Sequence, residues 1–164
     1  MIIQTSGDEY SEGVFRSQSG HFSIKIPGFP TQIQDYLTDV AKQKNIDTGK
    51  MFIWQFEKTL YTLFYLPSVS HNGDPQPQTL ANVENGTRKG IINGKAKITS
   101  EKPFKFGEYP GTEFRYDSLQ GLHYISRAFL VGETGYQVVG AYRNDADEKQ
   151  VLGVLDSFKL IKAK

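Results

Sequence analysis

The sequence predicts an α+β domain with a mostly antiparallel central sheet. The main observation is the stretch 109–144, which contains three apolar runs separated by two short turns with glycine. Aromatic and β-branched residues between glycine clusters are typical of strands, and short turns make consecutive strands pair antiparallel. The second observation is that two segments with helical spacing of apolar residues lie before and after this predicted three-stranded meander.

The N-terminal part is expected to add short strands. Residues 1–12 are polar and acidic and are predicted to form a flexible arm, so the single domain is assigned to residues 13–164. Residues 14–16 are predicted to be a short edge strand. Residues 22–26 alternate apolar and polar side chains, as a half-buried strand does, and the prolines that follow end it.

Residues 31–41 allow two interpretations. The spacing of Ile33, Leu37 and Val40 fits a helix slightly better, whereas residues 32–38 also fit an extended segment.

Two strands are predicted after this segment, over residues 50–58 and 60–66. The second, LYTLFYL, is apolar on both faces, which predicts layers above and below the sheet. The residues predicted for the core are Trp54, Phe64, Phe129, Leu155 and Phe158.

Residues 67–78 interrupt the pattern with three prolines and almost no apolar residues, so a loop is predicted. Residues 79–93 then predict a helix with Gly94 at its C-terminal cap. Its predicted buried stripe consists of Leu80, Val83, Thr87 and Ile91. Gly86 and Gly90 each cost a helix up to about 1 kcal/mol, and we interpret them as positions where the helix approaches the sheet closely.

The remaining elements flank the meander. Residues 96–99 are predicted to be a strand and residues 100–111 a loop. Asp145 and Glu148 fit a capping box at the start of a final helix over about residues 146–156. The predicted buried stripe of that helix is Val151, Leu152, Leu155 and Phe158. A short extended tail is expected at residues 158–161.

Length and composition exclude several classes of protein. A chain of 164 residues with 38% hydrophobic residues is large enough for one globular domain. Its net charge of +1 predicts no nucleic-acid partner. The absence of cysteine excludes disulfides and thiolate chemistry. We expect a monomer or a weak oligomer.

The sequence contains no recognisable catalytic motif, which predicts a protein that is not an enzyme and has no cofactor. The three histidines are isolated from one another, and neither a nucleophile motif nor a phosphate-binding glycine loop occurs. His71 with Asp74 is the one local pair suited to a metal ion. Two ligands on a loop make a weak site, so no metal is predicted.

A basic stretch spans residues 88–105, with Glu101 as its only acid. It is interpreted either as a docking patch for an acidic protein partner or membrane surface, or as a solvated helix face and strand edge, the more common origin of such charges. Phe104 and Phe106 lie within it and either cap the core or form an exposed anchor. The predicted partner-binding residues are His71, Asp74, Arg88, Lys89, Lys95, Lys97, Lys102, Lys105, Phe104 and Phe106.

Four segments resemble the PsbP-like family. Residues 20–30, GHFSIKIPGFP, resemble its opening strand, and residues 109–114, YPGTEF, resemble a strand start of its bacterial members. Residues 127–139 resemble its central hairpin. Residues 155–160, LDSFKL, resemble its closing signature. Together they span most of residues 13–161.

The resemblance implies an α/β/α sandwich, with an antiparallel sheet covered by helices on both faces. The photosystem II extrinsic protein PsbP and a family of Ran-binding nuclear import factors share this fold. The resemblance also favours a strand over residues 31–38. Bacterial members are often exported or lipid-anchored, which implies the periplasm or thylakoid lumen. The start of the sequence lacks signal-peptide features and by itself indicates the cytoplasm.

Three functional hypotheses remain. The first is a non-enzymatic binding or assembly module with a protein partner, as an accessory to a membrane-associated complex such as a photosystem. The second is a carrier of a small ligand or lipid, if the aromatic-rich sheet encloses an apolar cavity. The third is an enzyme whose site is assembled from distant strands.

Overall fold

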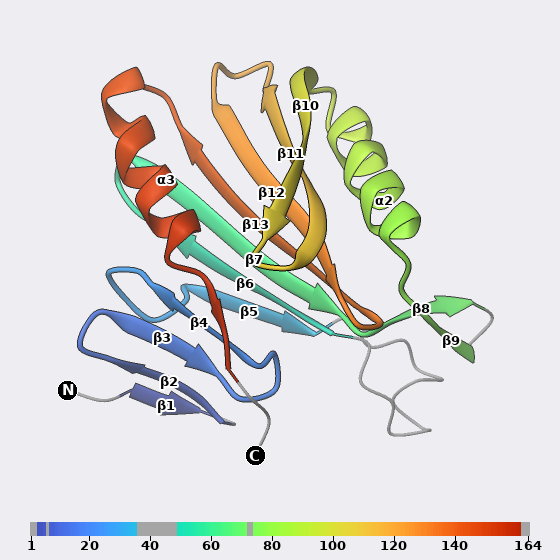
Figure 1. Cartoon of the computed structure of the whole chain (residues 1–164). Helices are drawn as coiled ribbons and strands as arrows, with labels where there is room; N and C mark the ends of the chain where they lie inside the picture. Colours follow the sequence, from blue (N-terminus) through green and yellow to red (C-terminus); the bar gives the residue numbers. More distant parts are fainter. Residues whose placement is uncertain (1–2, 6, 36–48, 72–73, 162–164) are drawn as a thin grey trace.

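The computed structural model describes residues 3–5, 7–35, 49–71 and 74–161. Its strands form a seven-stranded large sheet, a five-stranded small sheet and a two-stranded hairpin. All pairings among the described strands are antiparallel. Helices α2 (Leu80–Asn93) and α3 (Glu148–Asp156) pack on the large sheet, as Figure 1 shows. The predicted α+β class is therefore confirmed.

The large sheet contains the predicted meander. In spatial order its strands are β10 (Lys97–Phe106), β11 (Tyr109–Asp117), β12 (His123–Val131), β13 (Thr134–Tyr142), β7 (Thr59–Leu66), β6 (Lys50–Gln55) and β5 (Gln32–Asp35). The register places Tyr136 of β13 between Phe129 of β12 and Tyr65 of β7. Three neighbouring strands thus align aromatic side chains on one face.

The small sheet includes the segment for which a flexible arm was predicted. Its strands, in spatial order, are β1 (Ile3–Thr5), β2 (Asp8–Ser11), β3 (Val14–Ser17), β4 (Phe22–Lys25) and β14 (Lys159–Leu160). Strand β3 is therefore internal, not an edge strand. The prediction of a flexible arm relied on polar composition and is wrong for β2. This strand is held in place by ladder hydrogen bonds to β3 and by Tyr10, which packs against the core. The extended C-terminal tail is present as β14.

The two sheets share one hydrophobic core. Phe15 of β3 contacts Phe52 and Trp54 of β6, each with ring centroids 5.3 Å apart. Phe22 of β4 stacks on Phe158, which follows α3, at 5.6 Å. The predictions for Trp54, Phe129, Leu155 and Phe158 are confirmed, since all four are buried.

The two helices contact the large sheet through glycines of β13. Val83 of α2 packs on Gly135, and Val151 of α3 packs on Gly140, so that a side chain at either glycine would collide with the helix. These glycines are an odd number of residues apart and therefore point to opposite faces. The face that α3 contacts is also covered by the small sheet, a layer that was not predicted.

The helix ends agree only in part with prediction. The hydroxyl of Thr79 caps α2 by accepting from the Asn82 amide at 3.1 Å. Gly94 caps the other end, but the left-handed residue there is Lys95, with φ of 60°. The predicted capping box at Asp145 and Glu148 is wrong. A 3-10 turn, η1 (Asp145–Asp147), precedes α3, and its caps make no side-chain hydrogen bond.

Two predicted loops contain strands. Residues 67–78 include the hairpin of β8 (Ser68–His71) and β9 (Asp74–Pro77). Residues 100–111 complete β10 and begin β11. The prolines of residues 67–78 predicted a loop, yet Pro75 and Pro77 lie in β9 of a two-stranded hairpin, where one side of the ladder needs no donors. Pro103 likewise lies in β10, an edge strand of the large sheet. Residues 32–35 form β5, and the rest of the ambiguous segment, 36–41, lies outside the described residues.

Candidate ligand-binding groove

A groove runs between α2 and the large sheet. One cavity of about 420 Å³ lies beside the N-terminal half of α2, and a second of about 400 Å³ lies beside its C-terminal half. Phe64, Gly86, Thr87 and Gln137 line both cavities, so the two lie next to each other. Since α2 has 14 residues, the groove follows a helix about 21 Å long.

The floor of the groove is the part of the sheet that α2 leaves uncovered. Thr62, Phe64 and Leu66 of β7 line it, together with Gln137 and Val139 of β13. In β7 the alternate positions on the other face are fully buried, while these three are half-buried. The prediction of Phe64 as a core residue is therefore wrong, and β7 is fully covered on one face only.

On the α2 side, two glycines line the groove together with Asn82, Val83, Asn85, Thr87 and Ile91. A Cβ atom added at Gly86 or Gly90 would meet no other atom within 4 Å. The interpretation that these glycines allow close approach to the sheet is therefore wrong. Close approach comes from the sheet side, at Gly135. The helical glycines instead keep the groove wide.

A polar group is built into the apolar floor. Only 8% of Gln137 is exposed. Its Nε2 donates to Ser126 Oγ at 2.8 Å, and its Oε1 lies 3.5 Å from the hydroxyl of Thr87, which donates to the Val83 carbonyl at 2.9 Å. These contacts orient the amide and leave acceptor capacity on its oxygen.

The described residues of the lining carry no charge. Every residue named for either cavity has an uncharged side chain at neutral pH. Tyr116 and Tyr124 stack with centroids 4.8 Å apart at the C-terminal end. Burial, and secondarily the neighbouring Tyr124, raises the pKa of Tyr116, so its hydroxyl stays neutral. The groove therefore offers apolar surface, hydroxyls and amides.

Comparison with solved structures identifies the fold. The solution structure of cyanobacterial PsbP (CyanoP) from Synechocystis sp. PCC 6803 matches with a TM-score of 0.59 and 9% sequence identity, over 90% of this chain and 91% of that chain. The chain has the PsbP-like fold. At this identity the likeness shows the fold alone, and it confirms the resemblance found in the sequence.

A second match adds no further argument. A crystal structure from Bacteroides thetaiotaomicron VPI-5482 matches with a TM-score of 0.43 and 11% identity, over 92% of this chain and 48% of that chain. This chain thus spans about half the length of that one. No protein-family model matches the sequence, and no curated protein matches it either.

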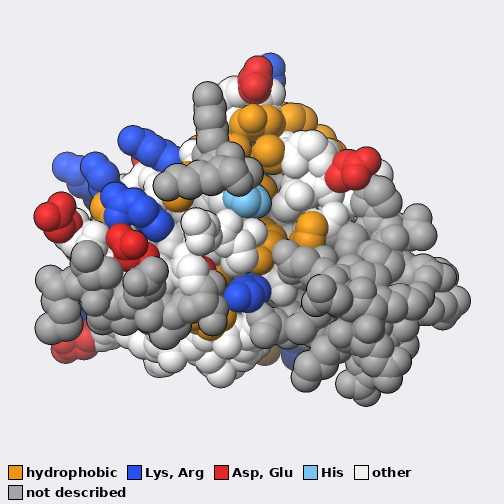
Figure 2. Space-filling model, turned by 90° about the horizontal axis from the view of Figure 1, so that it is seen from below, with side chains coloured by type: hydrophobic (Ala, Val, Ile, Leu, Met, Phe, Trp, Pro, Cys, Tyr) orange, Lys and Arg blue, Asp and Glu red, His pale blue; other side chains and the backbone are white. Residues whose placement is uncertain are grey.

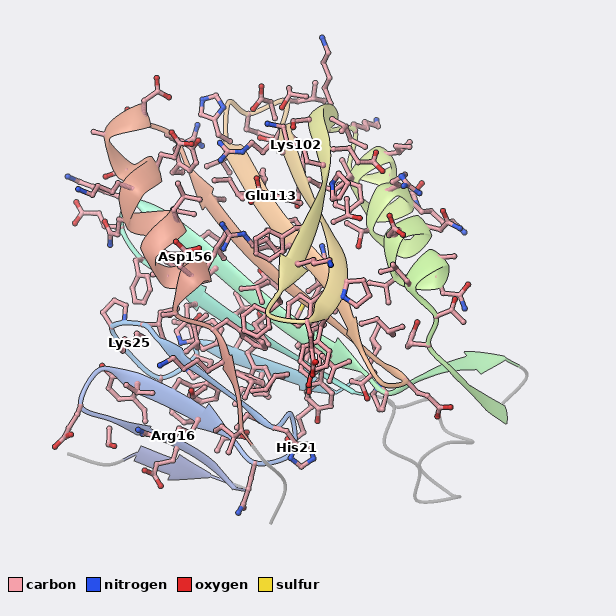
Figure 3. All side chains as sticks on the ribbon, in the orientation of Figure 1. Arg16, His21, Lys25, Lys102, Glu113 and Asp156 are labelled. Carbon is pink, nitrogen blue, oxygen red and sulfur yellow. The ribbon has the colours of Figure 1, made fainter. Side chains whose placement is uncertain are left out.

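In this PsbP-like fold the predicted basic residues do not gather on one face. Lys102 pairs in register with Glu113 on the α3 side of the sheet, where Figure 3 labels both, whereas Lys105 faces the α2 side. Arg88 donates from Nε to Glu101 at 2.8 Å and lies 3.6 Å from Glu84. The lysines at positions 89, 95, 97, 102 and 105 are exposed.

The two phenylalanines of the basic stretch lie at the margin of the core. Phe106 stacks on Phe129 with centroids 5.1 Å apart. Phe104 lies beneath the guanidinium of Arg127, 4.5 Å from the ring centroid. Both are half-buried, which agrees with a core-capping role.

The predicted metal pair lies in the β8–β9 hairpin. The register places His71 opposite Asp74, but their side chains lie outside the described part of the chain. Among the described residues, no group of three or more His, Cys, Asp or Glu side chains is placed to hold a metal ion. No helix in that described part is long and apolar enough to cross a membrane.

Ion pairs that the sequence analysis missed join α3 to the meander. Arg127, which is 8% exposed, lies 3.0 Å from Glu113 and 2.5 Å from Asp156. Arg115 lies 3.4 Å from Glu113 and 2.6 Å from Glu148, and the hydrogen bond to Glu148 raises the pKa of Arg115. Each carboxylate is engaged by an arginine, so this network tethers the helix. Its paired residues are up to 33 positions apart, and no local motif marks them.

Proposed function

We propose that this protein is a non-enzymatic binding module that holds an elongated, uncharged and largely apolar small molecule in the groove along α2. The observation that carries the proposal is the pair of neighbouring cavities, whose described lining residues all have uncharged side chains. Its two parts, about 420 and 400 Å³, have the size of small-molecule sites. A charged ligand would lose its hydration there without gaining a counter-charge.

The polar groups of the groove support a ligand with at least one hydrogen-bond donor. The Gln137 oxygen is held in place by Ser126 on one side of the amide and faces the Thr87 hydroxyl. A fixed acceptor in apolar surroundings orients a ligand more than it adds affinity. The remaining surface, with Phe64 and the Tyr116–Tyr124 stack, suits hydrocarbon or aromatic groups.

A catalytic use of the groove has less support. The His123–Asp117 pair, with Nδ1 and Oδ1 2.7 Å apart, is partly exposed. The register places His123 beside Tyr142, an even-numbered position of β13, whereas Gln137 on the groove floor is odd-numbered. The pair therefore lies on the other face of the sheet from the groove.

The test is a titration with the neutral fluorophore N-phenyl-1-naphthylamine. Gly86→Leu and Gly90→Leu place a side chain over the groove, and we expect each to weaken binding at least about tenfold. Gly153→Leu is the matched control, because Gly153 lies on exposed α3 surface with open space around its Cβ position. Unchanged affinity in both groove variants, or an equal loss in Gly153→Leu, would contradict the proposal.

A second candidate function is an accessory role in a membrane-associated complex such as a photosystem, with the chain acting as a monomer or weak oligomer. It is supported by the fold shared with CyanoP, and we propose with it the three-layer α/β/α arrangement of that family. The contact surface would be the segment 67–78 with His71 and Asp74, and the basic stretch 88–105.

This second candidate is tested with purified photosystem II cores by co-migration on native gels. We expect binding that weakens with salt and with the quadruple change of Lys95, Lys97, Lys102 and Lys105 to Glu. Equal co-migration of wild type and variant at low and high salt would show that the basic stretch is only a solvated surface. No co-migration would remove the candidate.

A further inference from the structure

We propose that one end of the molecule docks onto an anionic phospholipid bilayer. This surface, here called the tip, consists of Lys89, Ile92, Lys95, Lys97, Leu119 and Arg143. The inference goes beyond the groove ligand and does not depend on it. It rests on the exposure of apolar side chains, the sign of the charges around them, and the strand register that brings them together.

The register places the tip residues at the same end of the large sheet. Lys97 at the start of β10 pairs with Asp117 at the end of β11, and His123 at the start of β12 pairs with Tyr142 at the end of β13. The α2–β10 turn, the β11–β12 turn and the segment after β13 therefore lie together, at the upper end in Figure 1. Arg143 joins two of them by donating to a carbonyl of the β11–β12 turn at 2.6 Å.

Two large apolar side chains project from this end. Leu119 is 75% exposed and Ile92 is 63% exposed, the highest values among the large hydrophobic residues in the described part. Leu119 lies in a tight turn closed by the Gly121 amide donating to the Ser118 carbonyl at 3.1 Å, where polar residues are usual. Ser118, beside Leu119 in the sequence, and Gly94, two positions after Ile92, line the same cavity.

The charges around these side chains are mainly positive. Lys89, Lys95, Lys97 and Arg143 are exposed, whereas the nearby Asp117 is engaged by His123 at 2.7 Å. The acidic turn η1 lies at the same end of the sheet but beside α3, away from α2 in Figure 1. On the opposite side of the molecule, seen from below in Figure 2, basic side chains are interspersed with acidic ones.

Lys95 is placed against the preference of the backbone. Its φ of 60° is left-handed, a conformation in which glycine or asparagine costs less than lysine. The turn therefore displays a cation at a position where the fold alone would favour glycine. A surface with exposed apolar side chains inside a group of cations matches the boundary between anionic headgroups and acyl chains.

The experiment is co-sedimentation of the full chain with phosphatidylcholine vesicles, with and without phosphatidylglycerol, at low and high salt. We expect binding only to the anionic vesicles, weakened by salt. Leu119→Ser and Ile92→Ser should each lower partitioning at least about tenfold. The double change Lys95→Gly with Lys97→Gln should lower it by about fivefold per lost charge.

Matched controls lie on the small sheet and its C-terminal end. Ile161→Ser changes another exposed apolar side chain, and Lys25→Gln with Lys159→Gln removes two exposed charges; both should bind as the wild type does. Absence of vesicle binding, salt-insensitive binding to neutral vesicles, or equal losses in tip and control variants would each overturn the proposal. Because Gly86→Leu leaves the tip intact, normal vesicle binding by that variant separates this proposal from the groove ligand.

Discussion

Phe129 shows how single residues hold this fold together. Its ring stacks between Phe106, at 5.1 Å, and Tyr136, at 5.5 Å, and meets the ring of Phe158 edge-on at 5.4 Å. It is 1% exposed. Strands β10, β12 and β13 and the segment after α3 therefore meet at one side chain.

Replacing Phe129 by Ala is expected to lower the free energy of unfolding by about 3–5 kcal/mol, because it leaves a cavity among rings that cannot close it. Chemical denaturation with Trp54 fluorescence measures the loss. Phe129→Leu is the control and should cost less, since it retains most of the volume. A denaturation midpoint that does not move in Phe129→Ala would show the assignment to be wrong.

Because of Tyr136, the protein is expected to lose stability at alkaline pH. Burial raises its pKa to about 12, and its hydroxyl donates to the Gly20 carbonyl at 2.6 Å. The unfolded chain loses this proton near pH 10, where the folded protein keeps it. The stabilisation is therefore complete below about pH 10 and is lost as the pH rises towards about 12.

We expect Tyr136 to contribute up to about 2.7 kcal/mol of alkaline destabilisation, from a pKa that is raised by about two at about 1.36 kcal/mol for each unit. Urea unfolding at about pH 9 and about pH 11.5 tests this. Tyr136→Phe should be less stable at neutral pH by about 1 kcal/mol, through the lost hydrogen bond, but should lose less stability with alkali. Equal alkaline losses in the two proteins would refute the assignment.

Helix α2 contains two glycines that lower its stability and line the groove. Gly86 and Gly90 lower its helix propensity, and no packing contact at their Cβ positions requires glycine. Neither has a positive φ. The explanation left by the structure is the width of the groove.

Gly86→Ala and Gly90→Ala are each expected to raise the free energy of unfolding by about 0.5–1 kcal/mol, because alanine restricts the unfolded chain and meets nothing in the folded one. Thermal or urea unfolding measures the gain. Gly135→Ala is the opposing control and should destabilise, since its Cβ would collide with Val83. A loss of stability in the helical variants would restore the close-approach interpretation.

At the scale of the whole molecule, the two sheets share a core instead of forming separate units. Phe15 from the small sheet contacts both Phe52 and Trp54 of the large sheet. Trp54 also donates to the Gly28 carbonyl at 2.9 Å, between β4 and β5. Neither sheet retains a complete apolar core without the other.

We therefore expect one cooperative unfolding transition. The fluorescence of Trp54, the single tryptophan, and far-UV circular dichroism should report the same midpoint. Phe15→Ala should lower both midpoints together and cost about 3–5 kcal/mol. Separate midpoints for the two probes, with only one shifted in the variant, would mean that the sheets unfold independently.

The sequence by itself determined the elements whose signals are local. Glycine-bounded aromatic runs predicted the three strands of the meander and their antiparallel order, and apolar spacing predicted α2 from Thr79 to Asn93. Family-like segments predicted the fold that the comparison with CyanoP confirmed. These features depend on neighbours within a few residues, where propensity and turn geometry act.

Only the tertiary structure decided what depends on distant segments. It pairs the polar residues of β2 with β3, covers one face of β7 with the small sheet, and leaves Phe64 on the floor of a groove. It also shows that Gly86 and Gly90, which were interpreted as packing positions, line that groove instead. The physical reason is that burial and open space are properties of the surface a segment meets, and for each of these residues that surface is supplied by another part of the chain.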